Sequence, residues 1–313
     1  MIHGILNVQK EKGYTSHDVV AKLRGITRQK KIGHTGTLDP DAAGVLPVCL
    51  GRATRLCDMI TDRDKTYETV MLLGRTTDTQ DTSGQTLETA DTAGLDEYEV
   101  QKAIQEFVGD YAQIPPMYSA LKVDGRKLCD LAREGKEVER KARNVHISEI
   151  EILKISLPRV YMRVECSKGT YIRTLCHDIG NRLGCGGCME ELTRTRVGRF
   201  LLEDSLTLDE IAGKCKDKSL LEVLIPRDEM FREYAGLTVG SRWDSLAKNG
   251  NPLPKEAFLE VPDPRGWKER DTDGYPGHVR IYDEKGRFIA ICRWQEKEYR
   301  IVKMFYADGD SHN

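Results

Sequence analysis

The chain has 313 residues, of which 39% are hydrophobic and 31% charged, and its 48 basic residues against 50 acidic ones give a net charge of −2. This composition argues against a disordered chain or a collagen, and no apolar run approaches the roughly 18 residues that span a bilayer. At about 150 residues per domain, the length predicts two domains with substantial cores.

Residues 1–12 do not have the pattern of a signal peptide. A short apolar stretch is followed closely by charges and lacks a cleavage-site pattern, so we expect no signal peptide and a cytoplasmic location. Residues 2–8 are then predicted to form a buried strand, and Ser16 is typical of the N-cap of a helix that ends at Gly25. A polar, glycine-rich loop is expected over residues 30–44.

Residues 44–108 predict alternating short elements without a repeat. The expected elements are a strand at 44–50, a short helix at 52–60, a strand at 65–73, an acidic loop up to 95 and a helix at 96–108. Residues 111–121 are apolar, but Pro115 and Pro116 predict an extended segment rather than a helix.

The second half of the chain predicts more strands than helices. The expected elements are two strands within 145–166, a helix at 171–183, a strand at 192–202 and short strands at 237–239, 279–282, 288–294 and 299–304. Because strands and helices mix without a regular alternation, the order indicates an α+β fold with a largely antiparallel sheet. The last strands predict a small β-rich C-terminal domain.

Charge is unevenly distributed along the chain. Residues 19–38 contain no acidic residue and five basic ones, namely Lys22, Arg24, Arg28, Lys30 and Lys31. Residues 78–110 contain nine acidic residues against Lys102 alone. The basic stretch is a candidate phosphate-facing surface and the acidic one a solvated face, although two ordinary solvated faces explain the same pattern.

Nine cysteines are scattered along the chain, which favours reduced thiols in a chain of this length without a signal peptide. Cys185 and Cys188 have the spacing of half a zinc site. A second pair with this spacing is absent, so we expect no metal site.

The segment 31–47 (KIGHTGTLDPDAAGVLP) carries the most chemical information. Gly33 and Gly36 around His34 allow close backbone approach to a ligand, and Pro40 forces an extended or turn conformation at Asp39. Asp39 is either a rigidly held reactive carboxylate or a turn residue bonded to its own backbone. The chain lacks Walker, dinucleotide-binding, GxSxG and HExxH motifs, so any reaction is expected to use side chains alone, without a cofactor.

Four segments resemble bacterial tRNA pseudouridine synthases of the TruB family, in the family's order. These are residues 13–18 (GYTSHD), 33–40 (GHTGTLDP) continuing to 44–47 (GVLP), 64–67 (DKTY) with 74–79 (GRTTDT), and 166–173 (CSKGTYIR). The resemblance implies a pseudouridine synthase catalytic domain over 1–206 with an RNA-gripping insertion near 122–143, a linker region over 207–234, and a PUA-like RNA-binding domain over 235–313.

The resemblance also implies roles for individual residues. Asp39 corresponds to the catalytic aspartate, Arg173 to the arginine that pairs with it, and Tyr67 to the tyrosine that stacks on the target base. Tyr171 and Leu192 correspond to residues lining the uridine pocket, and His34 to the histidine that helps to hold the flipped-out nucleotide. Without the family, Leu192 is a core residue, Tyr67 an ordinary strand aromatic and Arg173 a surface arginine.

The implied function is the isomerisation of uridine 55 in the T-loop of tRNA to pseudouridine, by a monomer that needs no protein partner. The five basic residues of 19–38 then become candidate contacts to the RNA backbone. Two alternatives stay open: an RNA-binding or RNA-folding protein that has lost catalysis, and a synthase that acts on another RNA. The absence of long basic extensions disfavours assembly with a guide RNA.

Overall fold

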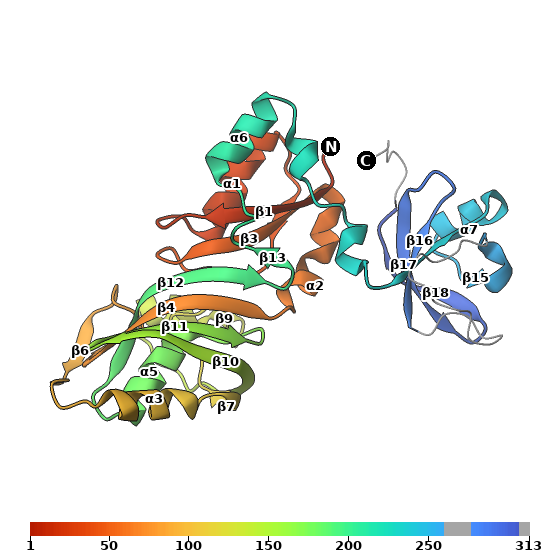
Figure 1. The fold of residues 1–313 in the computed structure, drawn as a ribbon. Coiled ribbons are helices and arrows are strands. Elements are labelled where there is room, and N and C mark those ends of the chain that lie inside the picture. Colours follow the sequence, from red (N-terminus) through yellow and green to blue (C-terminus); the bar gives the residue numbers. More distant parts are fainter. Residues whose placement is uncertain (260–276, 307–313) are drawn as a thin grey trace.

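A computed structural model describes residues 1–259 and 277–306, which form two main sheets and two small hairpins, with helices packed around the larger sheet (Figure 1). The larger sheet has nine strands from the N-terminal two thirds of the chain, and a five-stranded sheet lies near the C-terminus. Parts of the predicted C-terminal domain, residues 260–276 and 307–313, lie outside the described residues.

The nine-stranded sheet has the order β1-β3-β12-β4-β11-β10-β7, with β2 beside β3 and β13 beside β12. Its strands are β1 (Gly4–Lys10), β2 (Ile32–His34), β3 (Ala43–Leu50), β4 (Lys65–Leu73), β7 (Gly109–Gln113), β10 (Arg143–Ser156), β11 (Arg159–Cys166), β12 (Gly187–Val197) and β13 (Phe200–Leu201). Only β12 and β3 pair in parallel. The largely antiparallel α+β fold is therefore confirmed.

Two hydrophobic clusters hold helices against this sheet. Helices α1 (Ser16–Thr27) and α6 (Leu208–Lys216) cover β1 and β3, while α3 (Glu97–Gln105) and α5 (Ile172–Arg182) pack against β4, β10 and β11 (Figure 1). The remaining elements of this part are η1 (Gly51–Leu56), α2 (Cys57–Thr61), the hairpin β5 (Arg75–Thr77) and β6 (Thr86–Thr89), the hairpin β8 (Lys122–Val123) and β9 (Arg126–Lys127), α4 (Leu128–Arg133) and η2 (Leu220–Val223).

The five-stranded sheet has the order β14-β16-β17-β18-β15 and its own hydrophobic cluster. Its strands are β14 (Ala235–Thr238), β15 (Leu253–Pro254), β16 (His278–Tyr282), β17 (Phe288–Gln295) and β18 (Glu298–Met304), accompanied by η4 (Ser241–Trp243), α7 (Asp244–Lys248) and η5 (Lys255–Ala257). All four strands expected in this region are present, each with slightly different ends.

An aromatic cluster joins the two sheets. Phe231, in η3 (Asp228–Phe231), packs with Phe288 and Phe305, and the same buried cluster contains Ile5 of β1 and Val45 of β3. Ring centroids lie 5.0 Å apart for Phe288 and Phe305 and 5.8 Å apart for Phe231 and Phe305. The C-terminal sheet is thus anchored by shared core residues.

Several predicted elements are wrong in their details. Thr15, not Ser16, is the N-cap of α1, because its hydroxyl accepts from the Asp18 N–H while the Asp18 carboxylate accepts from the Thr15 N–H. The helix runs past Gly25 and ends where Arg28 adopts a left-handed conformation with φ of 52°. The expected acidic loop up to residue 95 contains the β5–β6 hairpin.

Other elements differ in where they begin and end. Within the expected loop 30–44, residues 32–34 pair with β3. The helix expected at 96–108 ends at Gln105, and Val108 is exposed. The strand expected at 192–202 begins at Gly187 as β12 and turns at Gly198, where φ is 52°, into β13.

No helix among the described residues is long and apolar enough to cross a membrane. Cys185 and Cys188 are buried and free, and within 1–259 and 277–306 no group of three or more His, Cys, Asp or Glu residues is placed to hold a metal ion.

Candidate active site

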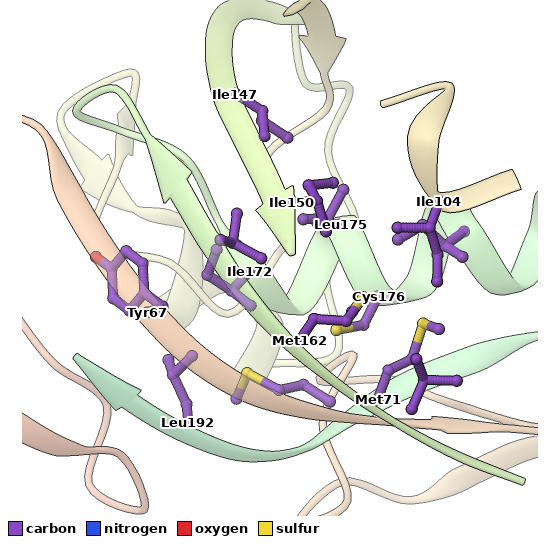
Figure 2. Close-up of a cluster of buried hydrophobic side chains, with 14 of the residues drawn as sticks. Tyr67, Met71, Ile104, Ile147, Ile150, Met162, Ile172, Leu175, Cys176 and Leu192 are labelled. Carbon is purple, nitrogen blue, oxygen red and sulfur yellow. The ribbon is translucent and has the colours of Figure 1, made fainter. Parts of the chain in front are cut away.

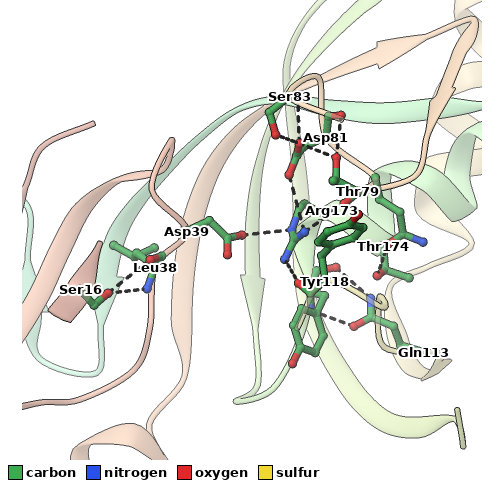
Figure 3. A network of polar contacts seen from close by, with 12 residues as sticks. Ser16, Leu38, Asp39, Thr79, Asp81, Ser83, Gln113, Tyr118, Arg173 and Thr174 are labelled. Atoms are coloured by element: carbon green, nitrogen blue, oxygen red, sulfur yellow. Dashed lines mark hydrogen bonds and ion pairs between the residues drawn. The ribbon is translucent and has the colours of Figure 1, made fainter. Parts of the chain in front are cut away.

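The loop that carries Asp39 lies between β2 and β3 and is fixed from two sides. The Ser16 hydroxyl accepts a hydrogen bond from the Leu38 N–H at 2.9 Å and lies 3.3 Å from the Leu38 carbonyl oxygen (Figure 3). The buried Lys10 donates from Nζ to the carbonyl oxygens of Pro40, at 3.1 Å, and Ala42. Backbone groups on both sides of Asp39 are therefore held by side chains from α1 and β1.

Arg194 on β12 binds the backbone of the same loop. Its guanidinium is almost fully buried and donates to the carbonyl oxygens of Val45, at 2.8 Å, and Gly36, at 3.2 Å. Gly44 passes so close that a Cβ there would lie 2.2 Å from the Arg194 carbonyl oxygen, and its φ is +112°. Only glycine fits this crossing, which sets the direction of β3 after the loop.

The structure brings Asp39 and Arg173 together. Arg173, on the first turn of α5, places Nε 3.1 Å from Oδ2 of Asp39 (Figure 3). The arginine side chain is only 7% exposed, whereas the aspartate side chain keeps 41% of its surface open. An immobile cation thus faces a carboxylate that a ligand can still reach.

Arg173 has further partners that fix the plane of its guanidinium. Nη1 donates to the Thr79 carbonyl oxygen at 3.0 Å, and Nη2 donates to the Tyr118 carbonyl oxygen at 2.8 Å. Nη1 also lies 3.6 Å from Oδ2 of Asp81, whose Oδ1 accepts from Thr79 and Ser83. The guanidinium therefore bridges two carboxylates, and only Asp39 belongs to the predicted set.

The Asp39 carboxyl has an unusual electrostatic environment. Burial by surrounding protein raises its pKa, the Arg173 guanidinium opposes this, and Asp81 adds to the rise. Lys10 also favours the charged form of Asp39. A carboxyl whose pKa is raised by burial and opposed by neighbouring cations is typical of functional sites.

An apolar surface lies beside the ion pair. Tyr67 on β4 and Leu192 on β12 belong to one buried cluster with Leu38 and Ile172, the neighbours of Asp39 and Arg173 (Figure 2). Tyr67 is 8% exposed, and burial raises the pKa of its hydroxyl. Tyr171 is half-buried and directly precedes α5. The charge of Asp39 influences the hydroxyls of both Tyr67 and Tyr171, and Leu192 belongs to the same buried cluster as Tyr67.

His34 and the basic residues lie apart from the ion pair. His34 makes an edge-to-face contact with His17 at 5.2 Å between ring centroids, its buried Nδ1 has no hydrogen-bond partner, and burial lowers its pKa. The basic residues Lys22, Arg24, Arg28, Lys30 and Lys31 are exposed on α1 and the loop after it. Among residues 1–259 and 277–306, none of these side chains forms a hydrogen bond or ion pair with Asp39.

Sequence patterns gave no signal for four residues that shape this site. Ser16 was predicted as a helix cap, and Lys10 and Arg194 look like ordinary strand cations until the fold buries them. Asp81 lies within the acidic stretch that we expected to be a solvated face, yet its side chain is only 17% exposed. Lys10 and Arg194 stand in the polar sequences NVQKEK and TRTRV, so no local pattern marks them as buried.

The Ser16 contact leads to a stability prediction. Ser16→Ala leaves the buried Leu38 N–H without a partner, so the free energy of unfolding is expected to fall by about 1–3 kcal/mol. Ser205→Ala is the control, because Oγ of Ser205 only donates to the Leu202 carbonyl oxygen and its loss strands no N–H. Urea denaturation of both variants measures the difference, and equal losses would contradict a special role for Ser16.

Comparison with known proteins matches two family models in series. The TruB family pseudouridylate synthase N-terminal domain matches residues 24–172, and the tRNA pseudouridylate synthase B C-terminal domain matches residues 173–232. Together these matches contain every predicted site residue except Lys22.

Similar proteins extend over almost the whole chain. Proteins named tRNA pseudouridine synthase B are 49% identical in Lachnoclostridium phytofermentans, covering 97% of this chain and 100% of the relative, and 41% identical in Clostridium acetobutylicum, covering 96% and 99%. A solved Cbf5-Nop10-Gar1 complex contains a chain with a TM-score of 0.70 and 26% identity, covering 97% of this chain and 85% of that one.

Proposed function

Because the chain belongs to the TruB family of pseudouridylate synthases, we propose that it isomerises the uridine at position 55, in the T-loop of tRNA, to pseudouridine. The observation that carries the proposal is the Asp39–Arg173 ion pair, at 3.1 Å, beside the apolar surface of Tyr67 and Leu192. A carboxylate, a cation and a surface for a planar base are what this reaction requires from a protein.

In the proposed reaction, Asp39 frees the base from the sugar. The bond between ribose C1′ and the base N1 breaks, the base turns, and C1′ bonds to C5, whose proton is lost while N1 gains one. An ionised Asp39 either adds to C1′ or removes the C2′ proton, and both routes need the carboxylate form. Arg173 supports the proposal because its guanidinium favours that form in a desolvated site.

The target uridine must leave its RNA stack to reach Asp39. Unstacking costs a few kcal/mol, and we propose that contacts with Tyr67, Tyr171 and Leu192 replace what is lost. The Tyr67 ring would stack on the base, and its hydroxyl would help to remove the C5 proton, since the nearby Arg194 opposes the rise that burial causes in the pKa of this hydroxyl. His34, whose ring is partly exposed, would hold the extruded nucleotide.

The remaining predicted surfaces are assigned to the RNA backbone. We propose that Lys22, Arg24, Arg28, Lys30 and Lys31, the insertion of residues 122–143, and a PUA-like domain over 235–313 contact tRNA, with 207–234 as the connection from the catalytic domain at 1–206. Single-stranded loops are recognised by shape and by splayed bases, which suits surfaces on several sides of one site. Neither a cofactor nor a partner protein enters this scheme, and we propose that a monomer acts.

The decisive experiment uses an unmodified tRNA transcript and the purified chain. After incubation, chemical labelling of pseudouridine followed by primer extension is expected to give one stop, at position 55. A modification elsewhere in the tRNA would contradict the proposed site. Tight binding with no modification would support a catalytically silent RNA-binding protein instead.

Binding of tRNA is expected to weaken steeply with salt. Each phosphate contact contributes a slope of about −0.7 to −0.9 in a plot of log affinity against log salt concentration. Replacing both Lys30 and Lys31 by Ala is therefore expected to make the slope shallower by about two phosphate contacts. Filter binding between 50 and 300 mM salt, about the range over which such effects are large, measures it.

The control for this measurement is Lys102→Ala, which removes an exposed lysine from the acidic stretch of residues 78–110. It should leave the slope unchanged. Wild-type affinity that does not vary with salt would contradict the proposed role of the basic residues.

A further inference from the structure

Gln113 is a buried polar residue next to the site for which the reaction above has no role. It is the last residue of β7, at the edge of the large sheet, and is 1% exposed, while the adjacent Ile114 is 50% exposed. Its side-chain amide makes two hydrogen bonds to the backbone of one residue, Tyr171. Nε2 donates to the Tyr171 carbonyl oxygen at 3.0 Å, and Oε1 accepts from the Tyr171 N–H at 2.8 Å (Figure 3).

The amide of Gln113 adds two bonds at the start of α5, where the Tyr171 carbonyl oxygen also accepts from the Leu175 N–H at 3.0 Å. Tyr171 is the N-cap of α5, and no side-chain cap forms there. A backbone N–H needs an acceptor and a backbone carbonyl needs a donor, so only one orientation of the amide satisfies both. The fixed N-cap leads within two residues to Arg173, whose Nε faces Asp39.

The segment after Gln113 contacts Arg173 directly. Residues 114–117 lead to Tyr118, whose carbonyl oxygen accepts from Nη2 of Arg173 at 2.8 Å. The far side of the insertion returns to this segment, since Nη1 of Arg140 donates to the Pro115 carbonyl oxygen at 3.2 Å. The root of the insertion and the start of α5 are thus joined at Tyr171 and at Arg173.

We propose that Gln113 is a positioning residue for pseudouridine formation. Its amide fixes the backbone of Tyr171 and, through the first turn of α5, the guanidinium of Arg173 relative to Asp39. The same residue fixes the position where the insertion of residues 122–143 leaves the sheet. RNA bound by this insertion and the Asp39–Arg173 pair that acts on the RNA are therefore both positioned by Gln113. This inference rests on the proposed function and adds to it a residue that contacts neither the reacting atoms nor RNA.

Two substitutions separate the parts of this contact. Gln113→Glu has the same shape and, when ionised, keeps the acceptor for the Tyr171 N–H but loses the donor to the Tyr171 carbonyl. When protonated it carries both groups again. Gln113→Met keeps the length and loses both bonds without adding a charge.

Gln29, which directly follows the C-cap of α1, offers a matched control, because its side chain bonds to the chain before β1 and not to α5. Its buried side chain makes the same pair of bonds, accepting from the Ile2 N–H at 2.9 Å and donating to the Ile2 carbonyl oxygen at 3.2 Å. Gln29→Glu and Gln29→Met therefore remove the same interactions from the N-terminus of β1. Any loss of activity that comes only from lower stability appears in both pairs.

The experiment measures single-turnover pseudouridine formation on a tRNA transcript, tRNA affinity and melting temperature for the four variants and the wild type. We expect both Gln113 variants to lose about tenfold to a hundredfold in rate, with affinity within about threefold, because a small misplacement of catalytic groups has effects of this size. The Gln29 variants should lose melting temperature but keep the wild-type rate. Equal rates in the two pairs would overturn the proposal.

A pH series gives the second readout. The rate of Gln113→Glu relative to Gln29→Glu should rise as the pH is lowered, because protonation restores the donor. Arg143, opposite Gln113 on β10, and Arg173 stay charged throughout, and burial keeps the Tyr171 hydroxyl neutral by raising its pKa. A ratio independent of pH would show that the donor to Tyr171 does not act in the reaction and would overturn the proposal.

Hydrogen exchange separates this proposal from the function on which it rests. The Tyr171 amide should be protected in the wild type and exchange faster in Gln113→Met, while the Ile2 amide responds only to Gln29→Met. Unchanged protection at Tyr171 would overturn the positioning role even if the wild type modified no tRNA. A wild type without turnover would by itself contradict only the proposed function.

Discussion

Asp39→Asn is expected to abolish pseudouridine formation, lowering the single-turnover rate by about 10⁴-fold or more. The amide has the shape of the carboxylate and can remain beside Arg173, but it can neither add to C1′ nor take the C2′ proton. Binding of tRNA should stay within a few-fold of wild type, since the proposed phosphate contacts do not include Asp39. The measurement is single-turnover pseudouridine formation together with tRNA affinity.

Asp41→Asn is the control for Asp39→Asn. Asp41 lies two residues further along the same loop, and its side chain is exposed. Asp41→Asn removes the same charge from the same part of the surface, so a general effect of charge on RNA binding appears in both variants. Turnover retained by Asp39→Asn would remove the central assignment of the proposed mechanism.

Arg173→Met is expected to lower the rate by about 10²–10³-fold, as does the loss of one fixed electrostatic contact in other active sites. The variant leaves the Thr79 and Tyr118 carbonyl oxygens without their donor and leaves Asp39 and Asp81 without the cation between them. The Asp39 carboxylate then lacks both its orientation and most of its charge compensation.

The same variant should change the pH dependence in a defined direction. Activity needs the ionised form of Asp39 and is lost as the pH falls through its pKa. Arg173 is the largest influence that lowers this pKa against burial, so its removal raises the pKa further. The acidic limb of the rate profile should therefore move to higher pH in Arg173→Met.

Arg182→Met is the control on the same helix. Arg182 forms an ion pair with Glu106 at 2.6 Å and is 57% exposed. Arg182→Met therefore removes a cation and a salt bridge from α5 without changing the site. Its rate and pH profile should match the wild type. An acidic limb in Arg173→Met that coincides with that of Arg182→Met would show that Arg173 does not govern the ionisation of Asp39.

The sequence predicted the fold class and most strands because their apolar runs are long and regular, as for β4, which has the predicted ends. It placed helix ends poorly, because Thr15 and Ser16 are equally good caps by residue type and only the fold decides that Ser16 faces Leu38. The β5–β6 hairpin in the acidic stretch was not predicted, because turns and polar strands have similar compositions there.

The residues of the candidate site could likewise be predicted only in part. Asp39, Tyr67 and Arg173 lie in recognisable motifs, so the resemblance named them before any contact was known. The contacts of Asp81, Arg194 and Gln113 depend on where distant strands cross, which no local pattern encodes. Asp81 illustrates the limit, because it stands among polar residues such as Gln80, Thr82 and Ser83 in a stretch predicted to face solvent, while its carboxylate lies beside Arg173.

The aromatic cluster of Phe231, Phe288 and Phe305 has a consequence for folding. Because these rings share one core with Ile5 and Val45, the two sheets should lose their structure in a single cooperative transition rather than melt one after the other. Deleting the chain after residue 234 would remove two of the three rings and expose the apolar surface beneath them. Such a truncated protein would report on damage to the catalytic half as well as on loss of RNA contacts, so point substitutions are the safer means of separating the two.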